Sequence, residues 1–267
     1  MDVNEQPIDT TTMAVGRFVD AGVEFAIESP CIRVERPSSD RTAFGSARVH
    51  LERSGPYVPD RRLHRTTLAG RVELRSGGVR IQGHVVGSGF EGSAVISPEH
   101  PWPTAAIVLP IAHAIADALG GVALHGAAVV VGDRAFVFIG PSGAGKSTAC
   151  RLVVGARELA ADRVVVVPHA GSLRAFRIDA GEPTGLPVVA DGVPVAAILR
   201  VRHDGVREGV VAGSRTQTLR DLRAACLAPS GSDEARIIDH LLAIPARTHV
   251  STVYTRLDRR IDPGNLR

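Results

Sequence analysis

The chain has 267 residues, of which 44% are apolar and 4% aromatic, so it is long enough for one large domain or two small ones with mostly aliphatic cores. Its 31 basic and 28 acidic residues give a net charge of +3, and the densest basic run, 61–65, is typical of a solvated edge, so we expect no nucleic-acid partner. The most apolar stretch, 104–132, contains Pro110 and Asp117 and predicts no membrane span.

The first part of the chain is predicted to be rich in β-structure. Residues 1–12 are polar and acidic, unlike a signal peptide, and are expected to form a disordered lead. Between about 23 and 97, short runs of alternating apolar and polar residues are separated by Gly, Ser and Pro clusters, which predicts antiparallel strands. The Pro-rich connector 98–103 is the best boundary, so we expect a β-rich region over 1–102 and a second domain over 103–267.

An apolar helix is predicted after the connector, ending at Gly120 and Gly121, with Pro110 in its first turn or at a kink. Its apolar residues recur at steps of three and four: Val108, Ile111, Ala112, Ile115 and Leu119. Two strand-like runs follow, 122–131 and 134–140, and the residues between them suit a tight hairpin turn.

The remainder alternates strands and helices. A helix over about 146–155 is expected to cross over to a neighbouring parallel strand, 158–161, before a corner and a hairpin that end near 178. Later elements are a strand at 193–203, helices at 218–228 and 232–244, and a strand at 248–257. Ser232 is predicted to be the N-cap of the second of these helices.

A phosphate-binding motif lies between the second strand-like run and the helix after it. Gly140, Gly145, Lys146 and Ser147 match the pattern G-x-x-x-x-G-K-[ST], in the strand–loop–helix context that the pattern requires. Glycines let successive N–H groups turn toward a phosphate, and the helix N-terminus adds its positive dipole end. The residues expected to contact the nucleotide are Gly140, Ser142, Gly143, Ala144, Gly145, Lys146, Ser147 and Thr148.

Lys146 is the only lysine in the chain, and the other 30 basic residues counted here are arginine. A compact ammonium on a thin stem can reach between two phosphates inside a tight loop, whereas a forked guanidinium is wider and prefers bidentate pairing. The single lysine also excludes an Asn-Lys-x-Asp motif of a GTPase, because no second lysine exists. The chain has no Leu-Ser-Gly-Gly-Gln segment either, which argues against a transporter ATPase.

Asp162 follows the predicted strand 158–161, at the end where ligand groups gather in open α/β sheets. A carboxylate there could bind magnesium, directly or through water, or accept a proton from an attacking hydroxyl. Read alone, Asp162 could also be a turn residue that opens the next strand. We favour the functional interpretation because Asp162 comes soon after the phosphate loop.

His125 is the second candidate. A two-residue turn at Gly132 and Asp133 pairs residue 131 with residue 134, and counting outward places His125 opposite Gly140. An imidazole there could touch the phosphates or bond the loop, or it could be a buried strand histidine satisfied by a carbonyl. His84 and His113 have no such context and are expected to be ordinary strand and helix residues.

Three segments, 124–148, 158–167 and 193–201, together with the two late helices, resemble the bacterial HPr kinase/phosphorylase superfamily and most of all its serine kinases, some of which tailor lasso-type ribosomal peptides. The pair His125-Gly126 and the run from Asp162 to Val164 match the family pattern, and the similarity covers about 120–260. The resemblance implies an α/β fold with a phosphate-loop-containing mixed sheet of the HPr kinase/phosphoenolpyruvate carboxykinase type, preceded by an antiparallel β-rich part.

The resemblance and the motif together predict an ATP-dependent kinase that phosphorylates a serine of a peptide or protein. Lys146, His125 and Asp162 are the expected catalytic residues, and Ser147 and Asp162 the expected Mg²⁺ ligands. The family often has two adjacent acids, whereas Ala161 precedes Asp162 here. That departure favours the alternative, a nucleotide-binding regulatory or scaffold protein with little turnover.

Two further expectations concern the surroundings of the protein. The span 165–193, where relatives place a substrate-contacting segment, is short and offers only Arg174 and Arg177 as basic side chains. Three widely spaced cysteines without a zinc pattern fit a reducing compartment, so a soluble, cytoplasmic protein is expected. The oligomeric state stays open, and a homo-oligomer is compatible with the sequence.

Overall fold

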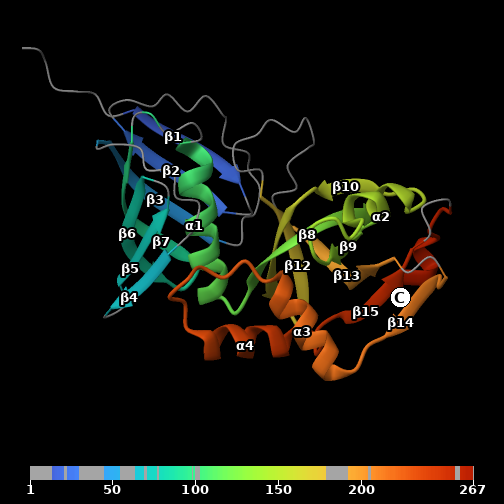
Figure 1. Ribbon diagram of the computed structural model, residues 1–267. Coiled ribbons are helices and arrows are strands. Elements are labelled where there is room, and N and C mark those ends of the chain that lie inside the picture. The colour runs from blue at the N-terminus through green and yellow to red at the C-terminus, as the bar shows by residue number, and fades with distance from the viewer. Residues whose placement is uncertain are drawn as a thin grey trace, which may run out of the picture.

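The computed structural model describes the residues 14–20, 23–29, 45–54, 64–68, 71–76, 78–97, 99, 103–178, 192–203, 206–255 and 259–266. This part of the chain is a mixed α/β structure with two mixed sheets and four α-helices (Figure 1). The predicted disordered lead lies outside the described residues, as does most of the 98–103 connector.

The first sheet has seven strands. Their spatial order is β1 (Ala14–Asp20), β2 (Val23–Ser29), β3 (Gly45–Arg53), β7 (Gly89–Ile96), β6 (Val79–Val86), β5 (Arg71–Ser76) and β4 (His64–Leu68). The prediction of antiparallel strands is only partly right, because β3 pairs parallel with both β2 and β7. Residues 30–44 separate β2 from β3 in the sequence, and β7 follows much later, so no tight hairpin sets the direction of β3.

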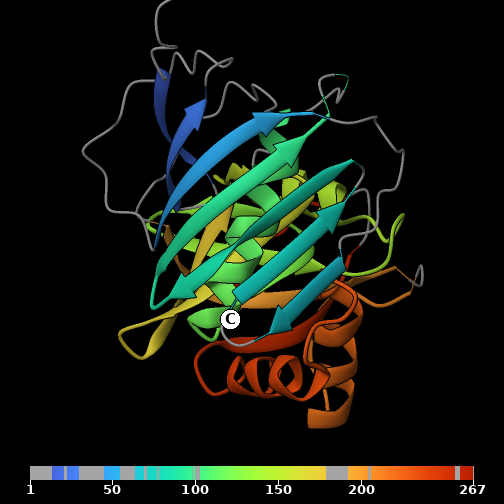
Figure 2. The ribbon, with the colours of Figure 1, turned by 90° about the vertical axis from the view of Figure 1, so that its left-hand side faces the viewer.

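The helix α1 (Pro103–Ala118) packs against the inner face of the first sheet and also faces the second sheet (Figures 1 and 2). Pro110 lies well inside α1, so the helix does not begin there. One buried cluster combines residues of both sheets with the helix: Val49, Leu51, Ile81, Ile107, Ile111, Ile115, Val165 and Val167. The division between residues 102 and 103 stays a prediction, with α1 in contact with both parts.

The second sheet has eight strands. They are β8 (Val122–Val131), β9 (Arg134–Ile139), β10 (Arg157–Ala160), β11 (Arg163–His169), β12 (Ser172–Arg177), β13 (Val193–Arg202), β14 (Gly209–Ala212) and β15 (His249–Tyr254). β13 pairs parallel with β9 on one side and with β15 on the other, so the carboxyl ends of these three strands meet at one edge. That edge carries the phosphate-loop motif, because the loop follows β9 directly.

The β8–β9 hairpin has the predicted register. The ladder runs from Val131 opposite Arg134 to Gly126 opposite Ile139. Gly132 has a φ of 61° at the turn, in the left-handed region that glycine adopts without steric cost. Continuing this register by one residue places His125 opposite Gly140, as the turn predicts.

Two predictions about the segment after the loop are wrong. β10 pairs antiparallel with β8 and is not a parallel neighbour of β9. β9 already has β8 on one side and β13 on the other, which leaves β10 no free edge of that strand. The helix α2 (Lys146–Leu152) ends three residues before the predicted residue 155, where Leu152 and Val154 exchange backbone hydrogen bonds with Ile261 near the C-terminus.

The helices α3 (Arg215–Ala225) and α4 (Glu234–Ala243) cover the second sheet through Leu222, Ala225, Ile237 and Leu241. A short 3₁₀-helix, η1 (Pro263–Leu266), follows near the end of the chain. The predicted N-cap of α4 is wrong by one residue. Asp233, and not Ser232, accepts hydrogen bonds from the N–H groups of Ala235 and Arg236, because the longer carboxylate reaches two of the helix's free donors.

Replacing Asp233 by alanine is therefore expected to lower the free energy of unfolding by about 1 kcal/mol, the usual cost of a lost N-cap. Ser232 is the matched control, because its Oγ is buried without a hydrogen-bond partner in the described part of the chain. Ser232→Ala should leave stability unchanged or raise it slightly, since it removes an unsatisfied polar group. Urea unfolding of both variants measures the difference, and a larger loss for Ser232→Ala would contradict the assignment.

Candidate active site around the phosphate loop

The loop between β9 and α2 has the backbone that its glycines predict. Gly143 and Gly145 have φ values of 78° and 90°, which most other residues adopt only under strain. The loop is tightened by a hydrogen bond from the Ala144 N–H to the Pro141 carbonyl, 3.1 Å long, and α2 begins at Lys146. The loop therefore presents the start of a helix at the carboxyl edge of the sheet.

Lys146 folds back into its own loop and is only 8% exposed. Its Nζ donates to the carbonyl oxygens of Gly140 and Pro141, at 3.0 and 3.1 Å, and lies 3.1 Å from His125 Nε2. These three acceptors match the three N–H donors of an ammonium group. Burial lowers the pKa of Lys146, and the carboxylate of Asp162 opposes that shift.

His125 connects Lys146 to Asp162. An ammonium group only donates hydrogen bonds, so Nε2 of His125 must accept, and the ring proton then lies on Nδ1. Nδ1 lies 3.1 Å from Asp162 Oδ1, and the other carboxylate oxygen lies 3.4 Å from Nε of Arg163. A continuous polar chain thus runs from the loop lysine through the imidazole to the carboxylate.

A bend between β10 and β11 positions Asp162. Both strands pair with β8, and the bend lies beside His125 and Gly126 of β8, at the end of the β8–β9 ladder nearest the loop. Arg163 pairs across the ladder with His125, and the Gly126 N–H donates to the carbonyl of Asp162 at 2.9 Å. Asp162 lies at the end of β10, as predicted, although it reaches the loop through β8 and not through a parallel neighbour of β9.

The residues that were predicted to bind magnesium can be reached from solvent. Ser147 is exposed at the start of α2, and the Asp162 side chain is 60% exposed. Within the described residues, no three His, Cys, Asp or Glu side chains cluster as metal ligands. Proteins commonly hold Mg²⁺ through one or two side chains together with phosphate oxygens and water, and the exposed oxygens of Ser147 and Asp162 are side-chain ligands of that kind.

Sequence reasoning missed an arginine-rich groove on the other side of the loop. The groove has a volume of about 470 Å³ and is lined by Pro141, Gly143, Ala144, Arg200, Val201, Arg202, His203, Arg207 and Tyr254. Besides the three loop residues, the lining residues come from the carboxyl ends of β13 and β15 and from His203 and Arg207, which follow β13. The signal that could have found it is the rule that ligands bind beyond the carboxyl ends of parallel strands.

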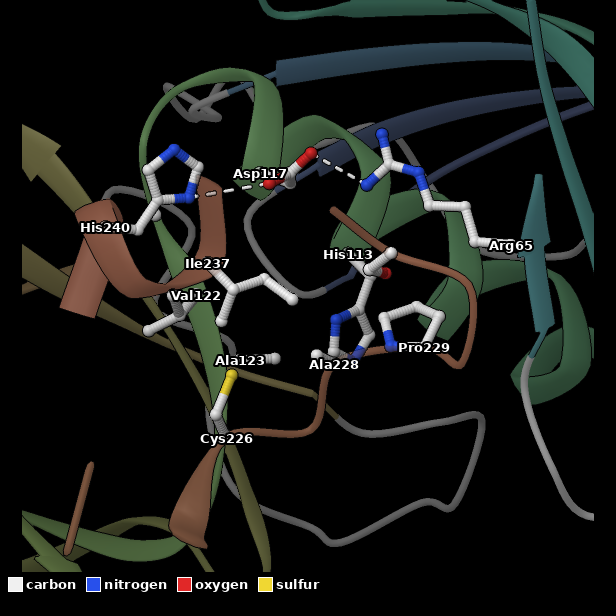
Figure 3. A pocket seen from close by; sticks show the side chains of 12 residues that line it. Arg65, His113, Asp117, Val122, Ala123, Cys226, Ala228, Pro229, Ile237 and His240 are labelled. Carbon is white, nitrogen blue, oxygen red and sulfur yellow. Dashed lines mark hydrogen bonds and ion pairs between the residues drawn. The ribbon is translucent and has the colours of Figure 1, made fainter. Parts of the chain in front are cut away.

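A second pocket lies away from the loop, between α1, the start of β8 and α4 (Figure 3). Its polar centre is Asp117, which lies 2.7 Å from Arg65 Nη1, 3.3 Å from Arg236 Nε and 3.4 Å from His240 Nδ1. Its volume of about 20 Å³ has room for a water molecule and not for a substrate. This cluster therefore joins β4, α1 and α4 and has a structural role.

The histidines that were expected to be ordinary lie outside the loop site. His113 is buried in α1 beside this second pocket, and burial lowers its pKa from 6.5 to about 4. His84 is exposed on β6. Arg174 and Arg177 lie on β12, and the Arg174 guanidinium donates to the carbonyl of Gly192 at 3.2 Å. Residues 179–191 of the predicted substrate-contacting span, 165–193, lie outside the described residues.

Comparison with known proteins assigns the chain to no family, so the proposal for its function rests on the geometry of the site. No protein-family model matches the chain, and no curated protein matches it significantly. Among the described residues, none of the helices is both long enough and apolar enough to cross a lipid bilayer.

Proposed function

We propose that the protein is an ATP-dependent kinase that transfers the γ-phosphoryl group to a serine hydroxyl of a peptide or protein. The observation that carries the proposal is the polar chain from Lys146 through His125 to Asp162 beside a glycine-rich loop. Phosphoryl transfer requires mainly positioning and charge neutralisation, together with a group that takes the hydroxyl proton. In this site the loop and Lys146 would supply the positioning and the charge, and the His125–Asp162 pair would take the proton. The fold that we infer for the protein is of the HPr kinase/phosphoenolpyruvate carboxykinase type.

Lys146 and the loop N–H groups are proposed to hold the β- and γ-phosphates. To reach them, the Lys146 ammonium exchanges its two loop carbonyls and His125 for phosphate oxygens. Ser147 and Asp162 would hold Mg²⁺, which neutralises charge on the transferred group. The exchange leaves Nε2 of His125 without its present donor and open toward the acceptor.

The His125–Asp162 pair also answers the difficulty raised by Ala161. With one carboxylate, the same residue would have to bind metal and take the proton. In the proposed mechanism the serine oxygen bonds to the γ-phosphorus, the bond to the β-phosphate oxygen breaks, and the serine proton passes to His125 Nε2. Asp162, 3.1 Å from Nδ1, stabilises the imidazolium that forms, so His125 and Asp162 divide the two tasks.

The alternative is a nucleotide-binding regulatory or scaffold protein, which Ala161 favours because a second acid is missing. Labelled-phosphate transfer from ATP to arrays of serine-containing peptides, each paired with its Ser→Ala counterpart, separates the two functions. We expect label on the serine peptides alone, and none with the Lys146→Ala variant. ATP binding without transfer or hydrolysis would support the alternative.

We also place the protein in the cytoplasm as a soluble enzyme. Cys150 and Cys226 are free thiols within the described residues, as a reducing compartment allows. Cys150 is buried in α2, and burial raises its pKa to about 12, so it is an inert core residue and not a nucleophile.

A further inference from the structure

The arginine-rich groove lies across the loop from His125 and Asp162. In the second sheet, β9 lies between β8, which carries His125, and β13, which carries Arg200 and Arg202. Loop and groove are in contact: a Cβ on Gly140 would lie 3.5 Å from the Val201 carbonyl oxygen, and one on Gly145 would lie 4.0 Å from Val201 Cγ1. A molecule held by the loop therefore has the proposed reaction centre on one side and the groove on the other.

The groove combines positive charge with flat, apolar surfaces. The guanidinium carbon of Arg207 lies 4.1 Å from the centroid of the Tyr254 ring, which is the geometry of a stacked cation–π pair. Pro141, Ala144 and Val201 supply apolar surface, and no acidic residue lines the groove among the described residues. This mixture suits a planar aromatic ring attached to an anion better than it suits a purely acidic ligand.

The groove is also held in shape by contacts behind it. Arg200 is paired with Asp221 of α3, which also accepts a hydrogen bond of 2.7 Å from Gln217. Nδ1 of His203 lies 2.8 Å from the Thr255 carbonyl oxygen, so the ring is fixed against the end of β15. Arg202 and Arg207 line the same groove. A groove of about 470 Å³ falls in the size range of small-molecule sites.

We propose that this groove binds the nucleoside half of the nucleotide, with the base stacked on the Arg207 guanidinium over Tyr254. The inference rests on the proposed function, because it requires that the phosphates occupy the loop. Loop residues themselves line the groove, so a nucleoside that is attached to phosphates in the loop and points away from His125 enters the groove directly. Stacking on a guanidinium plane favours the larger ring of a purine, so ATP and GTP should bind more tightly than CTP.

The test compares Mg²⁺–ATP with Mg²⁺–tripolyphosphate by calorimetry on the full chain. Arg207→Ala should weaken ATP binding about ten-fold, the scale of one lost base-stacking contact, and leave tripolyphosphate binding unchanged. Arg259→Ala is the matched control, because Arg259 is an exposed arginine that pairs with Glu208 at 3.2 Å and does not line the groove. It should bind both ligands as the wild type does.

Each outcome supports or overturns the nucleoside site. Equal losses for both ligands in Arg207→Ala would mean that Arg207 acts on phosphate, and unchanged ATP binding would mean that the base lies elsewhere; either result overturns the proposal. A wild type that binds neither ligand overturns both the loop assignment and the groove. A wild type that shows the expected difference but transfers no phosphate supports the groove and removes only the kinase.

Discussion

Replacing Lys146 by alanine is expected to weaken Mg²⁺–ATP binding by about a hundred-fold, because the variant loses charge-assisted hydrogen bonds to two phosphates, worth about 3 kcal/mol together. Lys146 is the only lysine of the chain and sits at the start of α2 with its amine directed into the loop. Isothermal titration calorimetry with wild type and variant measures the effect. Equal affinities would show that the loop does not hold the phosphates.

Two control variants separate geometry from charge. Lys146→Arg keeps the charge, but a planar guanidinium cannot satisfy the closely spaced acceptors that the ammonium now contacts, so we expect nearly the same loss of affinity as for alanine. Arg151→Ala removes a positive charge from the exposed side of the same helix and should leave ATP binding unchanged. If Lys146→Arg binds ATP normally, charge alone is sufficient and the specific need for lysine is refuted.

Replacing Asp162 by asparagine should lower phosphate transfer at saturating ATP by about a hundred-fold or more, the usual scale for the loss of general acid–base assistance. Asparagine keeps the size of the side chain but not the negative charge that faces Nδ1 of His125. Nucleotide affinity should stay within a few-fold of the wild type, because the loop, Lys146 and Ser147 remain and the asparagine keeps an oxygen that can contact Mg²⁺. Single-turnover transfer and calorimetry measure the two effects separately.

The matched control for this variant is Arg163→Ala. Arg163 is the chain neighbour of Asp162 and lies 3.4 Å from its other oxygen, so its removal leaves the Lys146–His125 and His125–Asp162 contacts in place. Its removal should lower transfer by a few-fold at most. His125→Ala, by contrast, should match the loss of Asp162→Asn, since the two residues act through one proton. If Asp162→Asn transfers phosphate like the wild type, the assignment of the pair is wrong even where the kinase survives.

Local sequence determined the loop and the residues opposite it. The glycine spacing, the single lysine and the two-residue turn at Gly132 are local features, and hairpin register follows from turn length alone. For this reason the sequence placed His125 opposite the loop and Asp162 at the end of β10. The hairpin that ends near residue 178, the strand near 193–203 and the two late helices also follow from local patterns, although α3 begins and ends three residues before the predicted 218–228.

Only the tertiary structure decided the arrangements that depend on distant partners. β10 does not pair with β9, because β8 and β13 already occupy both sides of β9. The helix α2 ends at Leu152, where Leu152 and Val154 form backbone hydrogen bonds with Ile261. β3 runs parallel to β2 and β7, which no turn in the sequence encodes.

The arginine-rich groove also depends on residues that are distant from one another in the sequence. Arg202 and Tyr254 are separated by more than fifty residues of sequence, yet β13 and β15 pair them directly in a parallel ladder. A parallel pair has no hairpin to announce it, because its strands are joined by a long crossover. The sequence by itself therefore determined the glycine-rich loop and the two residues that adjoin it, whereas the surface proposed to bind the nucleoside exists only once the chain has folded.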